Sequence, residues 1–120
     1  MPVWANEPPH QAIETESNLF GRTVNPYNKE LSPGGSSGGE AALIAQRGSL
    51  LGIGSDIGGS LRVPAAWTAI YSLKPSIARI PTSGYKFFYH DGMDHILGVM
   101  GPTARSLDDL ELYCKVSDLE

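Results

Sequence analysis

Two short segments rich in glycine and serine carry the residues best suited to chemistry. They run from Ser32 to Glu40 and from Gly54 to Arg62. Glycine lets the backbone turn where a side chain would clash, and successive amide N–H groups in such a turn point into one small space that holds an oxyanion. The second segment also places the hydroxyl of Ser60 at the mouth of that turn. One loop therefore offers both a nucleophile and the amide donors that stabilise a tetrahedral intermediate.

Two other interpretations of these segments stay open. A glycine-rich turn capped by a serine hydroxyl is often purely structural, and the second segment taken alone favours that interpretation. The first segment contains Gly35-Ser36-Ser37-Gly38-Gly39, which matches the Gly-x-Ser-x-Gly pattern of a nucleophile before a helix. On that alternative the protein is a Ser-His-Asp hydrolase with Ser37 as its nucleophile. The partners of that serine are then Asp56 and either His90 or His95.

Composition narrows the classes of function. The chain has 120 residues, enough for one domain with one core, and its formal net charge is -4. The charged residues are scattered, with no basic block to neutralise phosphates, so nucleic acid is not an expected partner. The single cysteine, Cys114, excludes an internal disulfide. No Cys/His cluster has the spacing of a zinc site, and neither a metal nor another cofactor is expected.

The sequence carries no recognisable targeting or membrane segment. It does not open with a basic region followed by an apolar run, and no stretch approaches the roughly 18 apolar residues of a membrane helix. We therefore expect a cytoplasmic protein that does not bind a membrane. Between a monomer and a homodimer the sequence makes no prediction.

The elements that position the two segments follow from local pattern. Residues 1–35 carry five of the nine prolines and little periodicity, so they are predicted to be a loop-rich lead-in. Ser37 and Glu40 form a capping-box pattern, and good helix formers follow as far as Gly48. A helix is therefore predicted over 38–47.

Three short apolar runs bounded by glycine or proline predict strands, at 49–54, 69–74 and 96–100. A final helix opens at Ser106, with acidic residues in its first turn. The residues along the apolar side of that helix are Leu107, Leu110 and Cys114. Because strands and helices alternate, the fold class is predicted to be α/β.

Taken together, the two segments resemble the amidase signature family. In that family Gly-Gly-Ser-Ser-Gly-Gly-Glu is followed by Gly-Ser/Thr-Asp-Ile-Gly-Gly-Ser-x-Arg-x-Pro, and both motifs occur here unbroken. Leu73-Lys74-Pro75-Ser76 and the stretch from Gly101 to Leu110 resemble later parts of the same family in the same order. The segment Phe20–Asn28 is similar to the branch of fungal acetamidases and fatty acid amide hydrolases.

The resemblance implies a partial amidase signature domain over residues 1–120, with the signature core at 36–110 and a mixed β-sheet flanked by helices. It also implies a Ser-Ser-Lys triad, in which Ser60 is the acylated nucleophile and Ser36 is the bridging serine after a cis peptide bond. By the same resemblance, the oxyanion hole consists of the N–H groups of Ile57, Gly58, Gly59 and Ser60. The residues expected to support this site are Ser37, Asp56 and Arg62.

The lysine of the triad has no match in this sequence. In the family it lies farther upstream than the 35 residues that precede Ser36. The four lysines of the chain stand at other places in the pattern, namely Lys29, Lys74, Lys86 and Lys115. We therefore expect a truncated hydrolase core for carboxylic amides, cleaving a small amide substrate to carboxylate and ammonia in principle but weakly active or inactive alone. The alternative is that the chain is not an enzyme but a non-catalytic remnant that binds an anion.

Three positions depart from the glycine that the family commonly has, and they are Ala41, Ser72 and Ala78. A Cβ costs about 1 kcal/mol or more where the backbone dihedral φ must be positive. Loops behind the site are therefore expected to be less stable at such a position.

Overall fold

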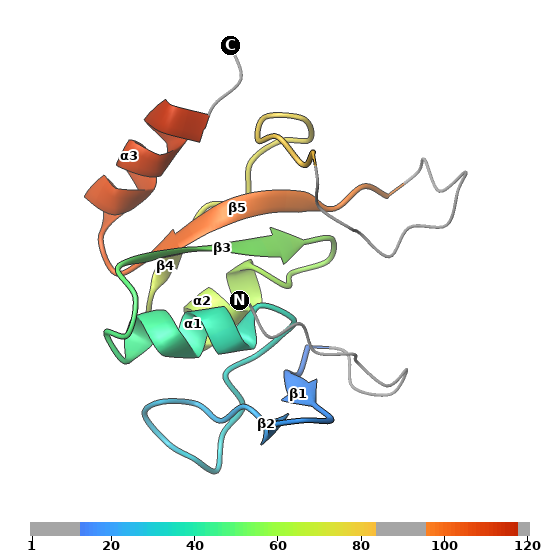
Figure 1. Ribbon diagram of the computed structural model, residues 1–120, viewed down its shortest axis with the longest axis vertical. Coiled ribbons are helices and arrows are strands. Elements are labelled where there is room, and N and C mark those ends of the chain that lie inside the picture. Colours follow the sequence, from blue (N-terminus) through green and yellow to red (C-terminus); the bar gives the residue numbers. More distant parts are fainter. Residues whose placement is uncertain (1–12, 84–95, 118–120) are drawn as a thin grey trace.

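The computed structural model describes residues 13–83 and 96–117 (Figure 1). Within these residues the chain forms a small sheet, a separate two-stranded hairpin and three helices. In chain order the elements are β1 (Glu16–Ser17), β2 (Gly21–Arg22), α1 (Gly38–Ala45), β3 (Leu51–Asp56), α2 (Arg62–Trp67), β4 (Tyr71–Ser72), β5 (Val99–Ala104) and α3 (Leu107–Ser117).

The sheet has the strand order β3-β5-β4, so β5 lies between two strands that precede it in sequence. Its register places Leu51 opposite Ala104 and Asp56 opposite Val99, while Tyr71 also pairs with Ala104. The expected combination of helices and sheet is confirmed. Every pairing in the described part of the chain is antiparallel, so the parallel pairs that a mixed sheet would add are absent there.

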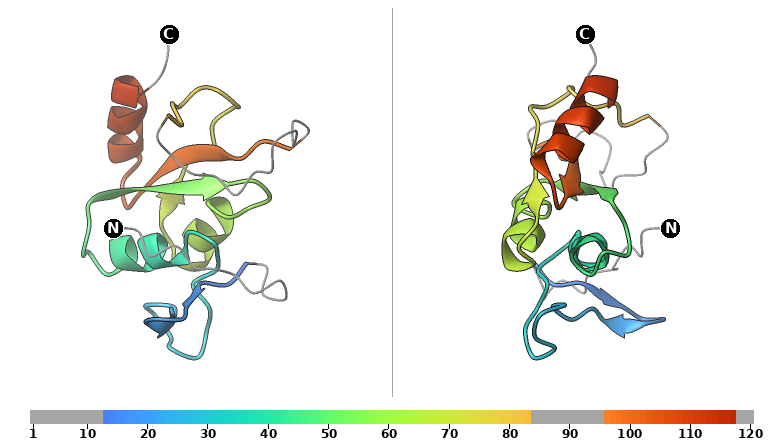
Figure 2. Two further views of the ribbon diagram at one scale, coloured as in Figure 1. Left: turned by 45° about the vertical axis from the view of Figure 1, so that its right-hand side comes forward. Right: turned by 90° about the vertical axis from the view of Figure 1, so that its left-hand side faces the viewer.

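The helices α1 and α2 lie together on one side of the sheet, and α3 lies on the other side (Figures 1 and 2). The β1–β2 hairpin lies beyond α1, away from the sheet. A core cluster of Ala41, Ile44, Ala65 and Ile70 lies between the first two helices and the start of β4. Two of the four are alanines, whose small side chains let α1 approach its neighbours closely.

Glycines on β3 permit the same close approach from the sheet. A Cβ at Gly52 would overlap the Glu40 side chain of α1, and one at Gly54 would lie 2.6 Å from both Leu61 Cδ1 and Ser37 Oγ. Both contacts are closer than real Cβ atoms allow. The strand thus brings the ends of both glycine-serine segments against one another.

Local signals located most elements within a few residues, and the differences have physical causes. The strand predicted at 96–100 runs instead over Val99–Ala104, through Pro102. Pro102 lacks an N–H, but its carbonyl still accepts a hydrogen bond from the Leu73 amide at 3.1 Å. Neither the β1–β2 hairpin nor α2 was predicted from the sequence. The helix α2 is six residues long and carries Pro64 in its first turn, where no backbone donor is needed.

The helix α1 ends at Ala45, two residues before the predicted end at 47. The Gly48 amide donates to the Leu43 carbonyl at 2.9 Å and the Arg47 amide donates to the Ile44 carbonyl at 3.0 Å, which is the pattern of a Schellman motif. The left-handed residue of that motif is Arg47, with φ +65°, rather than Gly48. Glycine was therefore a correct sign that the helix ends but not the residue that takes the unusual conformation.

The predicted capping box is wrong. Ser37 is the N-cap residue of α1, yet its side chain makes no capping hydrogen bond. Its hydroxyl is used by β3 instead, where it accepts from the Ser55 amide at 3.2 Å. The first-turn amide of Gly38 donates to the Thr15 hydroxyl, at 3.1 Å. Tertiary contacts thus replace the local cap.

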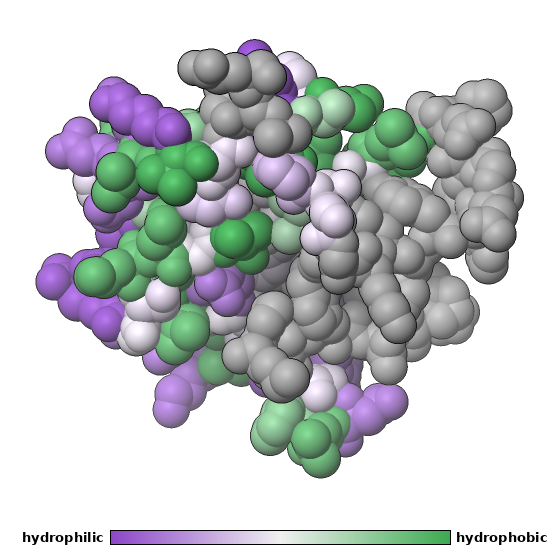
Figure 3. Space-filling model, turned by 45° about the horizontal axis from the view of Figure 1, so that its top comes forward, coloured by the Kyte–Doolittle hydropathy of each residue, from purple (hydrophilic) through white to green (hydrophobic). Residues whose placement is uncertain are grey.

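The apolar side predicted for the final helix is only partly buried. Leu110 is 6% exposed, whereas Leu107 is 61% exposed. Figure 3 shows apolar side chains at the surface among polar ones on the face that it presents. None of the helices in the described residues is long and apolar enough to cross a membrane.

Candidate active site

The two glycine-serine segments meet through their backbones. The Ser37 amide donates to the Ser60 carbonyl at 3.1 Å. The Ser37 hydroxyl accepts from the Ser55 amide and contacts the Ser55 carbonyl at 3.4 Å. Ser37 is 8% exposed, so these bonds are shielded from water. The segment that carries Ser36 is therefore fixed against the loop that carries Ser60.

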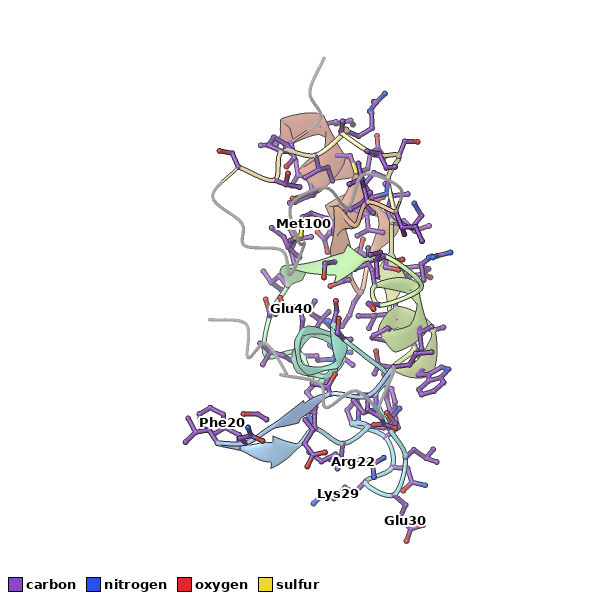
Figure 4. The ribbon with its side chains drawn as sticks, turned by 90° about the vertical axis from the view of Figure 1, so that its right-hand side faces the viewer. Phe20, Arg22, Lys29, Glu30, Glu40 and Met100 are labelled. Carbon is purple, nitrogen blue, oxygen red and sulfur yellow. The ribbon has the colours of Figure 1, made fainter. Side chains whose placement is uncertain are left out.

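Ser36 and Ser60 are both half-buried. The cis peptide bond expected before Ser36 is present between Gly35 and Ser36. On one side Ser36 borders a cleft of about 500 Å³ between the hairpin and α1, whose lining also includes Phe20 and Glu40. Figure 4 shows Phe20 on the hairpin and Glu40 between α1 and the sheet.

The carboxylate of Asp56 organises the loop after β3. Its Oδ1 accepts from the Gly59 amide at 2.8 Å, and its Oδ2 accepts from the amides of Leu61 and Arg62, each at 3.3 Å. The Arg62 guanidinium donates to both oxygens, from Nε at 2.9 Å and from Nη2 at 3.0 Å. The Asp56 side chain is fully buried, whereas that of Arg62 is 54% exposed. The loop thus wraps around one buried charge.

This environment keeps Asp56 ionised. Burial alone would raise the pKa of its carboxyl, but the hydrogen bonds from Arg62 and from the loop amides outweigh burial and lower the pKa below its ordinary value. A carboxylate is an acceptor only, so it holds all five donors at once. Asp56 and Arg62 therefore brace the loop.

Of the four amides expected to form the oxyanion hole, Gly59 is already engaged, because its N–H donates to Asp56. The amides of Ile57, Gly58 and Ser60 make no hydrogen bond to another residue in the part of the chain that the structure describes. Ile57 and Gly58 are also exposed. The Gly59 amide is thus directed at Asp56, whereas the other three amides of this loop have no partner among the described residues.

Thr15 and Glu40 make tertiary contacts near Ser36 that the sequence did not predict. Thr15, in the predicted loop-rich lead-in, is 2% exposed, and its hydroxyl donates to the Gly34 carbonyl at 3.0 Å. Glu40 bonds to β3 instead of capping its helix. Burial raises the pKa of Glu40 although a hydrogen bond from the Ile53 amide opposes that shift. Each of these contacts joins segments far apart in sequence, so no local signal announces them.

Comparison with known proteins agrees with this geometry. Residues 10–118 match the Amidase family. The chain belongs to the amidase family. The acetamidase of Aspergillus oryzae is 51% identical over 100 residues, which are 83% of this chain and 18% of that protein.

Solved amidase structures share the fold as well as the sequence. A fatty acid amide hydrolase matches with a TM-score of 0.78 and 44% identity, over 87% of this chain and 18% of that one. A bacterial aryl acylamidase of the amidase signature family matches with a TM-score of 0.77 and 39% identity, over 89% of this chain and 21% of that one. The chain thus spans about a fifth of the length of these relatives.

The amidase geometry argues against a Ser-His-Asp site centred on Ser37. The Ser37 hydroxyl is buried and bonded to the Ser55 backbone, and no strand leads into it through residues 31–36. Asp56, the acid of that alternative, is bonded to Arg62. The two candidate histidines, His90 and His95, lie outside the described residues.

None of the lysines in the described residues forms a hydrogen bond with Ser36 or Ser60. Lys74 Nζ donates to the Pro75 carbonyl at 3.1 Å, and Lys115 forms an ion pair with Glu111 at 2.6 Å. Lys29 lies with Glu30 at the end of the molecule opposite α3, as Figure 4 shows. Lys86 lies outside the described residues.

Proposed function

We propose that this chain is the nucleophile-bearing core of an amidase that cleaves carboxylic amides of the type R–CO–NH₂ through an acyl-Ser60 intermediate. The observation that carries the proposal is the loop around Ser60. It offers three amides that have no partner within residues 13–83 and 96–117, and it is hydrogen-bonded to the segment bearing Ser36. Hydroxyl and amide donors on one loop are what acyl transfer needs. Membership of the amidase family supports the same reaction class.

In the proposed first step, Ser60 Oγ attacks the carbonyl carbon, and its proton passes by way of Ser36 Oγ to a base. The carbonyl oxygen becomes an oxyanion and accepts from the N–H groups of Ile57, Gly58 and Ser60. One such donor is typically worth about 3 kcal/mol of barrier. The C–N bond then breaks as the relayed proton reaches the nitrogen, and ammonia leaves.

In the second step, water attacks the acyl-Ser60 ester while the base takes one of its protons and returns it to Ser60 Oγ as the ester C–O bond breaks. The carboxylic acid leaves and loses the other proton to the solution. The described lysines do not supply the base of this scheme, because Lys74 and Lys115 bond to other groups and Lys29 lies far from the sheet. We propose that the intact enzyme provides it as a lysine from polypeptide that its longer relatives have in addition to this segment. General acid-base assistance is typically worth about 10²- to 10⁴-fold in rate, so the 120 residues alone react slowly.

A second candidate function is anion binding without chemistry, and the same three amides favour it equally. A carboxylate such as acetate then binds the loop with the same affinity in Ser60→Ala. Gly59→Val disrupts the loop in either case, because Gly59 has φ +132° and a Cβ there would lie 3.2 Å from Val63 Cγ2. Covalent labelling separates the two functions, since binding alone leaves Ser60 unmodified.

The test is reaction of the folded chain with a fluorophosphonate, followed by mass spectrometry to locate the modified residue. We expect slow labelling at Ser60 that accelerates when free ethylamine supplies a base in solution. Labelling is lost in Ser60→Ala and slowed in Ser36→Ala, but unchanged in the control Ser76→Ala, which removes an exposed hydroxyl elsewhere. Absence of a Ser60 adduct with the amine present contradicts the proposal.

A further inference from the structure

The buried hydroxyl of Thr15 forms hydrogen bonds on both sides of Ser36 in the segment that carries it. Thr15 Oγ1 donates to the Gly34 carbonyl at 3.0 Å and accepts from the Gly38 amide at 3.1 Å. These two partners stand two residues before and two residues after Ser36. A hydroxyl is both a donor and an acceptor, so one side chain closes both bonds.

Thr15 is itself held by the hairpin. The Thr23 amide donates to the Thr15 carbonyl at 2.9 Å, which continues the pairing of β1 with β2 by one step. On the other side, a Cβ at Gly38 would overlap the Thr15 hydroxyl. Thr15 is thus tightly packed between the hairpin and the start of α1.

The neighbour of Thr15 contacts the same turn. Glu14 Oε2 accepts from the Ser32 hydroxyl at 2.7 Å, and the Gly34 amide donates to that hydroxyl at 3.0 Å. A Cβ at Gly35 would overlap the Glu14 backbone. Residues 14 and 15 therefore pack along the turn from Ser32 to Ser36 and connect it to the hairpin.

We propose that Thr15 is a positioning residue that fixes Ser36 relative to Ser60. The inference rests on the proposed function, in which Ser36 Oγ relays the proton of the nucleophile. The remaining anchors of this segment, from the Ser37 amide to the Ser60 carbonyl and between the Ser37 hydroxyl and the Ser55 backbone, all act one residue after Ser36. Without the Thr15 hydroxyl, the chain before Ser36 loses its bond at Gly34 and α1 loses one at Gly38. A displacement of about 1 Å is enough to cost roughly 10²-fold in rate.

The test compares Thr15→Val, which keeps the shape and removes the hydroxyl, with Thr15→Ser, which keeps the hydroxyl. Thr68→Val is the matched control, because Thr68 is fully buried and its hydroxyl donates to the Pro64 carbonyl at 2.8 Å, at the C-terminal end of α2. The first readout is fluorophosphonate labelling at Ser60 with ethylamine present. The second is the backbone NMR resonance of Ser36, measured on each folded variant.

We expect Thr15→Val to lower the limiting labelling rate by about tenfold or more at an unchanged half-saturating concentration of reagent, and to shift the Ser36 resonance. Thr15→Ser restores both, and Thr68→Val changes neither although it also loses a buried hydroxyl. If Thr15→Val does not fold, the pair Thr15→Ser and Thr15→Ala, which differ only by the hydroxyl, carries the same comparison.

The two readouts separate this inference from the proposed function. If the unmodified chain forms no Ser60 adduct, the proposed function fails, and the Ser36 resonance alone decides the role of Thr15. A resonance that moves in Thr15→Val and returns in Thr15→Ser supports the inference in that case as well. An unmoved Ser36 resonance, or an unchanged labelling rate in Thr15→Val, overturns it.

Discussion

Replacing Asp56 by asparagine tests the physical basis of the loop around Ser60. The carboxylate accepts five hydrogen bonds, and the asparagine amide retains only one of the two oxygens. The less costly orientation turns the new NH₂ group toward the side with fewer donors. There it faces the Gly59 amide and Arg62 Nη2, two donors that it cannot accept from.

The expected cost follows from the bond that water does not replace. The Arg62 side chain is 54% exposed, so solvent screens its ion pair with Asp56 and the loss of that contact adds little to the free-energy cost. The buried Gly59 bond to a charged acceptor is typically worth about 1.5 to 3 kcal/mol. For a chain of this length, that corresponds to a fall in the melting temperature of roughly 6 to 12 °C.

Thermal and urea unfolding followed by circular dichroism measure this cost, with Asp108→Asn as the control for loss of an exposed carboxylate. The control should change stability by less than about 0.5 kcal/mol. Because the pKa of Asp56 is lowered in the folded state, its contribution is present at neutral pH and is lost as pH falls below about 4. A loss under 0.5 kcal/mol at pH 7, or a loss that persists undiminished in acid, would refute this reasoning.

Three further predictions concern stability. Burial raises the pKa of Glu40 above 4.5, so the stability of the chain should fall as pH rises from there through the raised value; Glu40→Gln should remove that slope from a series of urea midpoints, and an identical slope in both proteins contradicts the assignment. Ala78 has φ +66°, so Ala78→Gly should stabilise the chain by up to about 1 kcal/mol in urea unfolding, whereas Ala66→Gly, within α2, should destabilise it by a similar amount. Arg47→Gly, at the left-handed end of α1, should raise the melting temperature by a few degrees, roughly 2 to 4 °C, and a decrease would show that the arginine side chain matters more than its backbone strain.

The parts of the fold that local chemistry determines were predictable from sequence. Helix formers between Ser37 and Gly48 indicated α1, and glycine on both sides of a short apolar run indicated β3. Elements whose stability comes from distant contacts were not predictable. Each strand of the hairpin has only two residues. The hairpin is held in place by Thr15, which lies just before β1 and whose hydroxyl bonds to residues 19 and 23 positions away in sequence.

The candidate site divides in the same way. The order of Ser36 and Ser60 and the cis peptide bond followed from the family motif, and the structure brings their segments together. The departure at Ala78 was also apparent, and it is the only one of the three altered glycine positions with a positive φ in the structure. The engagement of the Gly59 amide was not apparent, since the motif records which residues are present and not which donor Asp56 uses.

The most direct test of the central claim is to locate the fluorophosphonate adduct in the folded chain with ethylamine present. We predict a single adduct at Ser60, absent in Ser60→Ala and formed more slowly in Ser36→Ala. An adduct at Ser37, or none at Ser60 in a chain shown to be folded, would contradict the claim that these two segments build an amidase nucleophile.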